Sequence, residues 1–294
     1  METLETLAEM LETTGDIKSI VRTMKSLSAV SIRQYEQAER AMSGYEETVD
    51  LGLAALLKDR RARGLSLPET IVPGAETEAL IVIGSDRGLC GRYNEIVTRH
   101  AAGRISDRTQ VLAAIGTQAA ARLDAGGRRP DRIFLLPGSV GGMAALVQSV
   151  IVETDRWTRD PGVGRICLIH NRREGHARSV PVEKPLLPIP ESYLRRLLDE
   201  DWPGPGLPFL RMGPARLLAS LVRQRLFVVL YRALAEALAS EHATRLAAMQ
   251  NAERNIEERR EELNSAYRRK RQETITRELL DVVSGFEAVS SSDA

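Results

Sequence analysis

The feature that most constrains the fold is a long run near the C-terminus that contains neither proline nor glycine. It follows Pro214 and continues to about Val283. Because both residue types interrupt helices, their absence predicts a single helix. At about 1.5 Å per residue, a helix of roughly 70 residues reaches on the order of 100 Å, farther than a compact domain of this size can bury. The sequence therefore predicts a helix that needs a partner outside its own domain.

A second long helix is predicted at the other end of the chain. No proline occurs from Leu4 to about Leu57, and apolar residues recur there at helical spacing. The pattern predicts one helix, with Gly15 as the point at which it is broken. Because the two long helices bracket the rest of the chain, antiparallel pairing is the economical arrangement. We expect the N- and C-terminal helices to form a shaft, as a long and irregular antiparallel coiled coil.

Short apolar runs alternate with helical patterns in the middle of the chain. This alternation predicts a small, mainly parallel, Rossmann-like α/β domain inserted between the two helices. One of its helices is expected over Gly141–Trp157. The segment Val180–Pro190 is too rich in proline for a central strand and is expected to form an edge strand or the exit. The predicted strands are Ala79–Gly84, Gln110–Ile115, Arg132–Leu136 and Arg165–His170.

These elements divide the chain into three predicted parts. They are an N-terminal shaft helix at residues 1–60, the α/β domain at 75–195 and a C-terminal shaft helix at 210–288. Segments rich in proline and glycine separate the parts, at Arg60–Pro73 and at Trp202–Pro208.

The composition narrows the classes of partner. The formal charge is +1, from 41 basic and 40 acidic side chains, so the chain lacks the global positive field that drives nucleic-acid binding. The balance favours protein partners. Two cysteines fit a reducing compartment, and the acidic N-terminal residues do not form a signal peptide. No apolar run approaches the roughly 20 residues of a membrane helix, so we expect a cytoplasmic chain that meets a membrane only through partners.

The residues that most resemble a chemical site have simpler explanations. The glycine-rich Ser85–Asn94 follows a strand, but neither GxGxxG nor GxxxxGK[ST] is present, which favours a structural turn over a phosphate cradle. Cys90 and His100 lack a third, orienting group, and both cysteines are expected to be structural or buried thiols. His170 and His176 lack further ligands at metal spacing and are expected to be solvated. No catalytic, cofactor-binding or metal-binding residue is predicted.

The C-terminal helix becomes more polar along its length. A basic cluster at Arg268–Arg271 is surrounded by glutamates on the same helix, and the apolar stripe thins towards Lys270. Mixed charge of this kind is typical of a helix surrounded by protein rather than of one that grips nucleic acid.

Three separated regions resemble the γ subunits of F-type ATP synthases. IVRTMKSLSA at Ile20–Ala29 resembles the family's ITKAMKMVAA, and GSDRGLCGRYN at Gly84–Asn94 is similar to SDRGLCGxxN. SEHATRLAAMQNA at Ser240–Ala252 and YRRKRQETITRELLDVVSG at Tyr267–Gly285 resemble SEHxxRMxAMxxA and YNKxRQxxITxELxEIVxG. The motifs occur in the same order as in the family and extend over almost the whole chain.

The resemblance implies a non-catalytic central-stalk rotor. The rotor turns inside a ring of three α and three β subunits, and β holds the nucleotide sites. Its foot meets the ε subunit and the membrane c-ring, which couples ion transport to ATP synthesis or hydrolysis at the cytoplasmic face of the bacterial cell membrane. No cofactor is implied for the rotor itself. The positions that match contacts with β are Met24, Lys25, Arg271, Gln272, Thr276 and Glu278.

The chain departs from the family pattern at its start, where the family has a basic helix. The acidic residues there are Glu2, Glu5, Glu9, Glu12 and Asp16. This departure suggests a divergent, alternative-type bacterial complex. Two other classes of protein share the predicted layout: an α/β enzyme with helical oligomerisation arms and a coiled-coil scaffold unrelated to motors. The ordered motifs favour the rotor.

Overall fold

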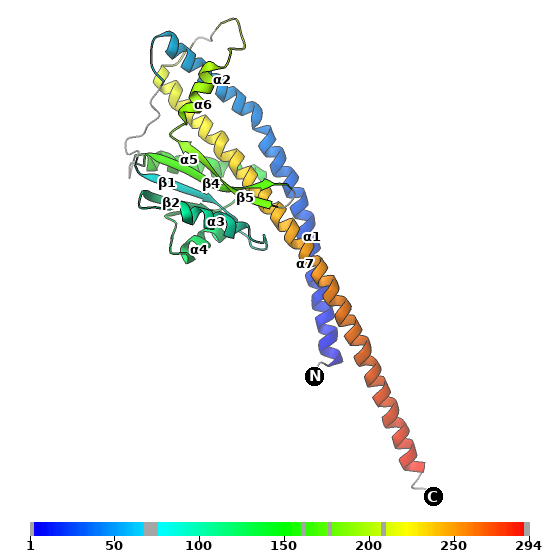
Figure 1. Cartoon of the computed structure of the whole chain (residues 1–294). Helices are drawn as coiled ribbons and strands as arrows, with labels where there is room; N and C mark the ends of the chain where they lie inside the picture. Colours follow the sequence, from blue (N-terminus) through cyan, green and yellow to red (C-terminus); the bar gives the residue numbers. More distant parts are fainter. Residues whose placement is uncertain (1–2, 68–75, 160–162, 176–177, 207–209, 291–294) are drawn as a thin grey trace. The chain divides into compact units, whose positions relative to one another are not determined.

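The fold is known from a computed structural model, which describes residues 3–67, 76–159, 163–175, 178–206 and 210–290 (Figure 1). Two compact units are formed, one by Met1–Leu27 with Leu246–Ala294 and the other by Ser28–Arg245. The long helices contribute residues to both units. The three-part division predicted from the sequence stays a prediction, and part of each predicted breaker lies outside the described residues.

The long terminal helices are confirmed, with one correction. The C-terminal helix α7 covers Pro214–Ser290 without interruption. The N-terminal helix α1 covers Leu4–Ala41 and passes through Gly15, so the predicted break at Gly15 is wrong. A side chain at Gly15 would meet no other atom within 4 Å, so this glycine only lowers helix propensity, by about 1 kcal/mol.

The real break in the N-terminal helix lies at Met42, between α1 and α2 (Ser43–Ala62). The Met42 amide donates to the Glu39 carbonyl three residues back, at 3.2 Å. The Ser43 hydroxyl donates to the Arg40 carbonyl at 2.7 Å. These tighter, local hydrogen bonds replace one turn of the α-helical ladder and redirect the chain.

A five-stranded sheet forms the centre of the Ser28–Arg245 unit, with strand order β3-β2-β1-β4-β5. The first four strands in the chain pair in parallel, and β5 is antiparallel to β4. The strands are β1 (Glu78–Ile83), β2 (Thr109–Ile115), β3 (Arg132–Phe134), β4 (Arg165–Glu174) and β5 (Arg178–Leu187). The shorter helices are α3 (Tyr93–Arg104), α4 (Thr117–Ala125), the 3₁₀ turn η1 (Val140–Gly142), α5 (Met143–Trp157) and α6 (Glu191–Asp199).

Both predictions about the proline-rich segment and the central helix are confirmed. β5 is the edge strand, where Pro181 and Pro185 cost no ladder hydrogen bond if their nitrogens face away from β4. The helix α5 buries the side chains that the helical spacing places on one face. They are Met143, Val147, Val150, Thr154 and Trp157.

Alternation along the strands divides the core into two layers. In β1, Ala79, Ile81 and Ile83 face a core shared with α5 and α7. Leu80 and Val82 face the opposite layer, which α3 and α4 supply. A third cluster joins α2, α6 and the beginning of α7. The helix α7 is therefore part of the domain core over this half of its length.

The unit of Met1–Leu27 and Leu246–Ala294 is an antiparallel pair formed by α1 and α7. Lys18 lies 2.9 Å from Glu257, and Arg22 lies 2.9 Å from Glu253, so rising numbers in one helix meet falling numbers in the other. Each helix of the pair also buries apolar side chains, such as Val21 of α1 and Met249 of α7. Figure 1 shows that α7 continues beyond the N-terminal end of α1.

Candidate functional site

The first candidate surface is the face of α1 that does not pack on α7. Leu7 and Val21 are buried, whereas Ile17 and Ile20 are exposed large apolar residues. The exposed large apolar residues of α1 within this unit are Met10, Ile17, Ile20 and Leu27. Spacings of three and seven residues place these side chains along one stripe of the helix. An apolar stripe of this length on the surface indicates an interaction site for another protein.

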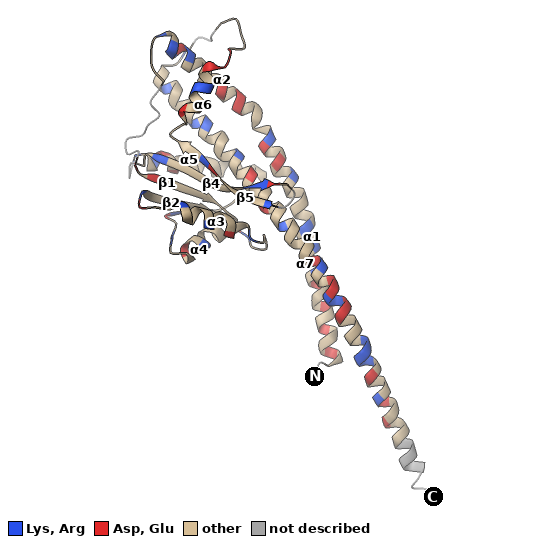
Figure 2. Ribbon diagram, viewed as in Figure 1, with Lys and Arg blue, Asp and Glu red and all other residues tan. Residues whose placement is uncertain are grey.

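The second candidate surface is the end of α7. The exposed apolar side chains there are Ile275, Leu279, Leu280, Val282 and Val283, of which Val282 is 68% exposed. Figure 2 shows charged residues along the middle of α7 and fewer of them towards its described end. This end of the helix is therefore both apolar and unburied, which is unfavourable in water.

Two of the sequence-predicted contact residues lie on α1, on the flank of its apolar stripe. Met24 and Lys25 are both half-buried. The Lys25 ammonium forms an ion pair with Glu253 of α7, which Arg22 also contacts. Hydrogen bonds from Lys25 and Arg22 lower the pKa of the Glu253 carboxyl. Lys25 can therefore reach an acidic partner only by leaving or sharing Glu253.

The other four predicted contact residues lie on the end of α7. Arg271, Gln272, Thr276 and Glu278 are all exposed. Within the part of the chain that the structure describes, their side chains have no hydrogen bond or ion pair of their own. Steps of three and four residues place Arg271 and Glu278 on one stripe with Ile275 and Val282. Directional polar groups thus alternate with apolar ones on the surface of α7.

The glycine-rich turn after β1 is explained by packing. A side-chain carbon at Gly84 would lie 2.3 Å from Cβ of Ala119, and Gly116 has φ +106° with Ser85 backbone atoms 2.8 Å from the position of its missing Cβ. The Asp86 carboxylate accepts hydrogen bonds from the Thr117 amide at 2.8 Å and the Leu136 amide at 2.7 Å. The loop is bound to its own domain, as the structural interpretation predicts.

The two cysteines occupy different surroundings. Cys90 is buried beside Ser85, and burial raises the pKa of its thiol. His100 instead lies 2.8 Å from Glu183, so the structure does not bring Cys90 and His100 together. Burial raises the pKa of the half-buried Cys167 thiol to about 11, which keeps it protonated at neutral pH.

The expectation that His170 is solvated is wrong. Its side chain is fully buried, with Nε2 2.9 Å from a Glu236 oxygen, and Lys184 lies 3.0 Å from the other oxygen. Burial would raise the pKa of Glu236, but hydrogen bonding and charge from His170 and Lys184 lower it to about 2. The alternation of β4 carried the signal, since His170 shares a face with buried Ile166 and Leu168.

No cluster of metal ligands is found among the described residues. His176, the other histidine considered as a ligand, lies outside those residues. None of the described helices combines the length and the apolar character needed to cross a membrane.

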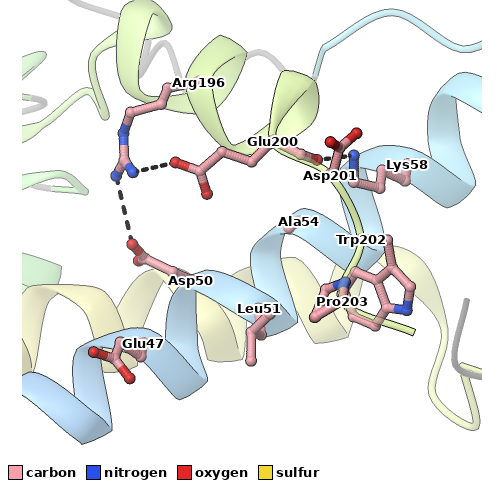
Figure 3. Close-up of a pocket in the computed structure, with 10 residues that line it drawn as sticks. All are labelled: Glu47, Asp50, Leu51, Ala54, Lys58, Arg196, Glu200, Asp201, Trp202 and Pro203. Carbon is pink, nitrogen blue, oxygen red and sulfur yellow. Dashed lines mark hydrogen bonds and ion pairs between the residues drawn. The ribbon is translucent and has the colours of Figure 1, made fainter.

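A cavity of about 310 Å³ lies between α2, α6 and the segment after α6 (Figure 3). Four of its charged side chains, those of Asp50, Lys58, Arg196 and Glu200, are already paired within the chain. Arg196 contacts Glu200 at 2.6 Å and Asp50 at 3.5 Å, and Lys58 donates to the backbone carbonyls of Leu198 and Glu200 at 2.8 and 2.6 Å. These contacts hold α6 on α2 and cap its C-terminal end.

Comparisons with known proteins agree over nearly the whole chain. A family model described as ATP synthase matches residues 3–289. The chain is 31% identical to the ATP synthase gamma chain of Granulibacter bethesdensis, over 98% of this chain and 100% of the relative. It is 29% identical to the ATP synthase gamma chain of Salinibacter ruber, over 99% of this chain and 100% of the relative.

Solved structures show the same fold. The chain matches one from the OSCP/F1/c-ring structure of the Euglena gracilis mitochondrial ATP synthase with a TM-score of 0.67 and 19% identity, over 99% of this chain and 96% of that one. It matches a chain from the rotor of the same enzyme with a TM-score of 0.63 and 17% identity, over 92% and 98%.

Proposed function

Since this chain belongs to the family of ATP synthase gamma chains, we propose that it is the rotor of an F-type complex and couples ion flow through a membrane ring to ATP chemistry on other subunits. The chain is a component of ATP synthase and is not the catalytic subunit. Its partners in this proposal are three α and three β subunits, an ε subunit and the c-ring. It is held at the cytoplasmic face of a bacterial cell membrane through those partners.

The structural observation that supports the rotor role most directly is the bare apolar end of α7. Each large apolar side chain gains about 1.5–3 kcal/mol when it is fully buried, so the five between Ile275 and Val283 represent on the order of 10 kcal/mol before the costs of association. A surrounding collar of α and β subunits supplies that burial. The exposed stripe on α1 requires a partner for the same reason.

We assign the polar contacts with β to the residues between these apolar side chains. Arg271 and Gln272 carry several directional donors and have no partner among the described residues, so they are available to a β loop that moves past them. Thr276 and Glu278 extend this surface along α7. On α1, Met24 provides an apolar contact, and Lys25 exchanges Glu253 for a carboxylate of β.

A shaft of this kind imposes different states on identical subunits. The shaft does not present the same surface on every side, because α1 exposes the apolar stripe of Met10, Ile17, Ile20 and Leu27, whereas the end of α7 exposes polar side chains between apolar ones. Three chemically identical β subunits around it therefore meet three different surfaces at any moment. The shaft is thus the mechanical element that couples their sites.

The composition of the purified complex tests this proposal. A chain with an affinity tag at its N-terminus is purified from membranes of its own host, and the subunits are counted by native mass spectrometry. We expect α-like and β-like chains with this chain in the ratio 3:3:1, the stoichiometry that the family resemblance implies. Recovery of the chain alone, or with itself only, from active membranes contradicts the rotor assignment.

A further inference from the structure

One buried guanidinium joins the loop between β1 and α3 to helix α7. The Arg245 side chain is only 6% exposed, and its Nη2 atom lies 2.6 Å from an oxygen of Glu241, one turn earlier on the same helix. The same nitrogen lies 3.2 Å from the Gly88 carbonyl oxygen and 3.3 Å from that of Arg87. We call the group formed by Glu241, Arg245 and these two carbonyls the loop clamp.

The loop is also fixed on the side that faces the sheet. Asp86 accepts hydrogen bonds from the amides of Thr117 and Leu136, which follow β2 and β3. Asn94 accepts from the Ser85 amide at 3.0 Å and donates to the Ser85 hydroxyl at 2.7 Å. The loop therefore connects the carboxyl ends of the strands to helix α7.

Two residues of the loop have a left-handed backbone conformation. Leu89 has φ +59°, a left-handed conformation that costs a non-glycine residue energy and persists only where the surroundings impose it. Gly91 has φ +55°, and a side-chain carbon there would lie 3.4 Å from the Thr244 methyl group. Beyond the loop, the Tyr93 hydroxyl donates to the Ala237 carbonyl at 2.9 Å.

A need for stability does not explain the buried ion pair. Burial raises the pKa of Glu241, and Arg245 only opposes that rise. Apolar residues of similar volume often replace such pairs without loss of stability. A buried pair is better suited to fixing one geometry, because the Arg245 guanidinium reaches the Glu241 oxygen and the two loop carbonyls together in only one arrangement.

We propose that Arg245 is a positioning residue for energy coupling, which locks the loop at 85–92 to α7 so that the α/β domain and this helix turn together. Arg245 is the last residue of the Ser28–Arg245 unit, and α7 continues from it into the other unit. Torque that enters through the α/β domain thus reaches the helix without slip. The inference rests on the proposed rotor function. It gives a role to the motifs at Gly84–Asn94 and Ser240–Ala252, which contain the loop and the two residues of the ion pair.

The test separates coupling from stability. Arg245→Met combined with Glu241→Leu removes the clamp without leaving a buried charge, and Arg216→Met alters an exposed arginine on α7 as the control. Inverted membrane vesicles with the whole complex are assayed for ATP hydrolysis and for the membrane potential that hydrolysis generates. We expect hydrolysis within about twofold of the parent, because apolar replacement of a buried pair is nearly neutral. The potential generated per ATP should fall about fivefold.

A conservative variant tests whether a positive charge at position 245 is enough for coupling. Arg245→Lys with Glu241 intact should restore part of the coupling, because an ammonium group donates to the same three acceptors. A doubly apolar variant that keeps the parent ratio of potential to hydrolysis overturns the proposal.

If that variant does not assemble, hydrogen exchange on the purified full chain replaces the vesicle assay. Amides at 86–91 should then exchange about tenfold faster than in Arg216→Met, and equal exchange overturns the clamp. Parent vesicles that generate no potential count against the rotor function, whereas the exchange result still tests the clamp.

Discussion

Arg271 and Gln272 are the residues on which the predicted contact with β most depends. Replacing both with alanine should lower ATP hydrolysis by the whole complex about tenfold, because their exposed donors have no role in the fold of this chain. Subunit stoichiometry should remain that of the parent. The measurement is steady-state hydrolysis on purified complexes of confirmed composition.

The matched control for this pair is Arg277→Ala. Arg277 is also exposed, but six residues at about 100° each place it about 120° around α7 from Arg271. The control should retain parent activity. Equal losses in both variants, or none in either, remove the special role of Arg271 and Gln272.

His242 makes the stability of the chain depend on pH. Burial, with Arg245 and Arg87 nearby, lowers its pKa to about 4, and its ring stacks on Tyr35 at 5.6 Å between centroids. The unfolded chain takes up this proton near pH 6.5, so the stabilisation is complete above that pH and is lost as the pH falls towards 4. The shift corresponds to roughly 3 kcal/mol.

Urea unfolding of the full chain between pH 7.5 and 4.5 measures this dependence. His242→Phe keeps an aromatic ring on Tyr35 but cannot titrate, so its unfolding free energy should vary less over that range. If the unfolding free energy of His242→Phe varies with pH as steeply as that of the parent, groups other than His242 control the loss of stability in acid.

His170 shows what residue-level reasoning missed. His170 was expected to be solvated because a basic loop follows it in the sequence. That expectation did not take into account that His170 lies in strand β4. The alternation Ile166, Leu168, His170 places the imidazole in the core that α7 covers, where Glu236 meets it. The sequence could not identify Glu236 as the partner of His170, because Glu236 lies 66 residues away on another element.

At the scale of elements, helical periodicity and proline placement predicted most of the fold. The absence of proline and glycine predicted α7, and the prolines of Val180–Pro190 predicted an edge strand or the exit, of which the structure shows the edge strand β5. The break at Met42 was not predictable, because it depends on local hydrogen bonds between polar side chains and carbonyls that many helices tolerate. The loop clamp also depends on tertiary contacts that no local pattern encodes.

The apolar end of α7 gives a prediction for a single element. Leu279→Ser with Leu280→Ser should leave the thermal stability of the isolated chain unchanged, since these side chains are 61% and 60% exposed. Affinity for the α and β subunits should fall about 100-fold, the equivalent of roughly 3 kcal/mol of lost burial. Reconstitution of purified chains at graded concentrations measures this affinity.

A control on another surface completes that experiment. Val152→Ser alters a side chain that is 60% exposed on α5, which belongs to the Ser28–Arg245 unit. It should assemble like the parent. Unchanged assembly of the Leu279 and Leu280 variant shows that the end of α7 is not enclosed by partners.

At the scale of the whole molecule, the isolated chain should neither bind nor hydrolyse ATP. Close packing accounts for Gly84 after β1 and Gly116 after β2, and the Asp86 carboxylate accepts hydrogen bonds from two backbone amides. Titration calorimetry of the purified chain with ATP and Mg²⁺ should give no saturable heat. Binding in the micromolar range refutes this expectation and revives the α/β enzyme as an alternative.

Rotation of the chain inside its complex is the decisive test of the proposed rotor function. The α and β subunits are fixed to a surface, and a probe visible by light microscopy is attached to an exposed cysteine introduced at Ser106, in the α/β domain. With ATP supplied, we expect sustained rotation of the probe in one direction, and the Arg271 and Gln272 double variant should rotate more slowly. A probe that stays still on complexes that hydrolyse ATP contradicts the account.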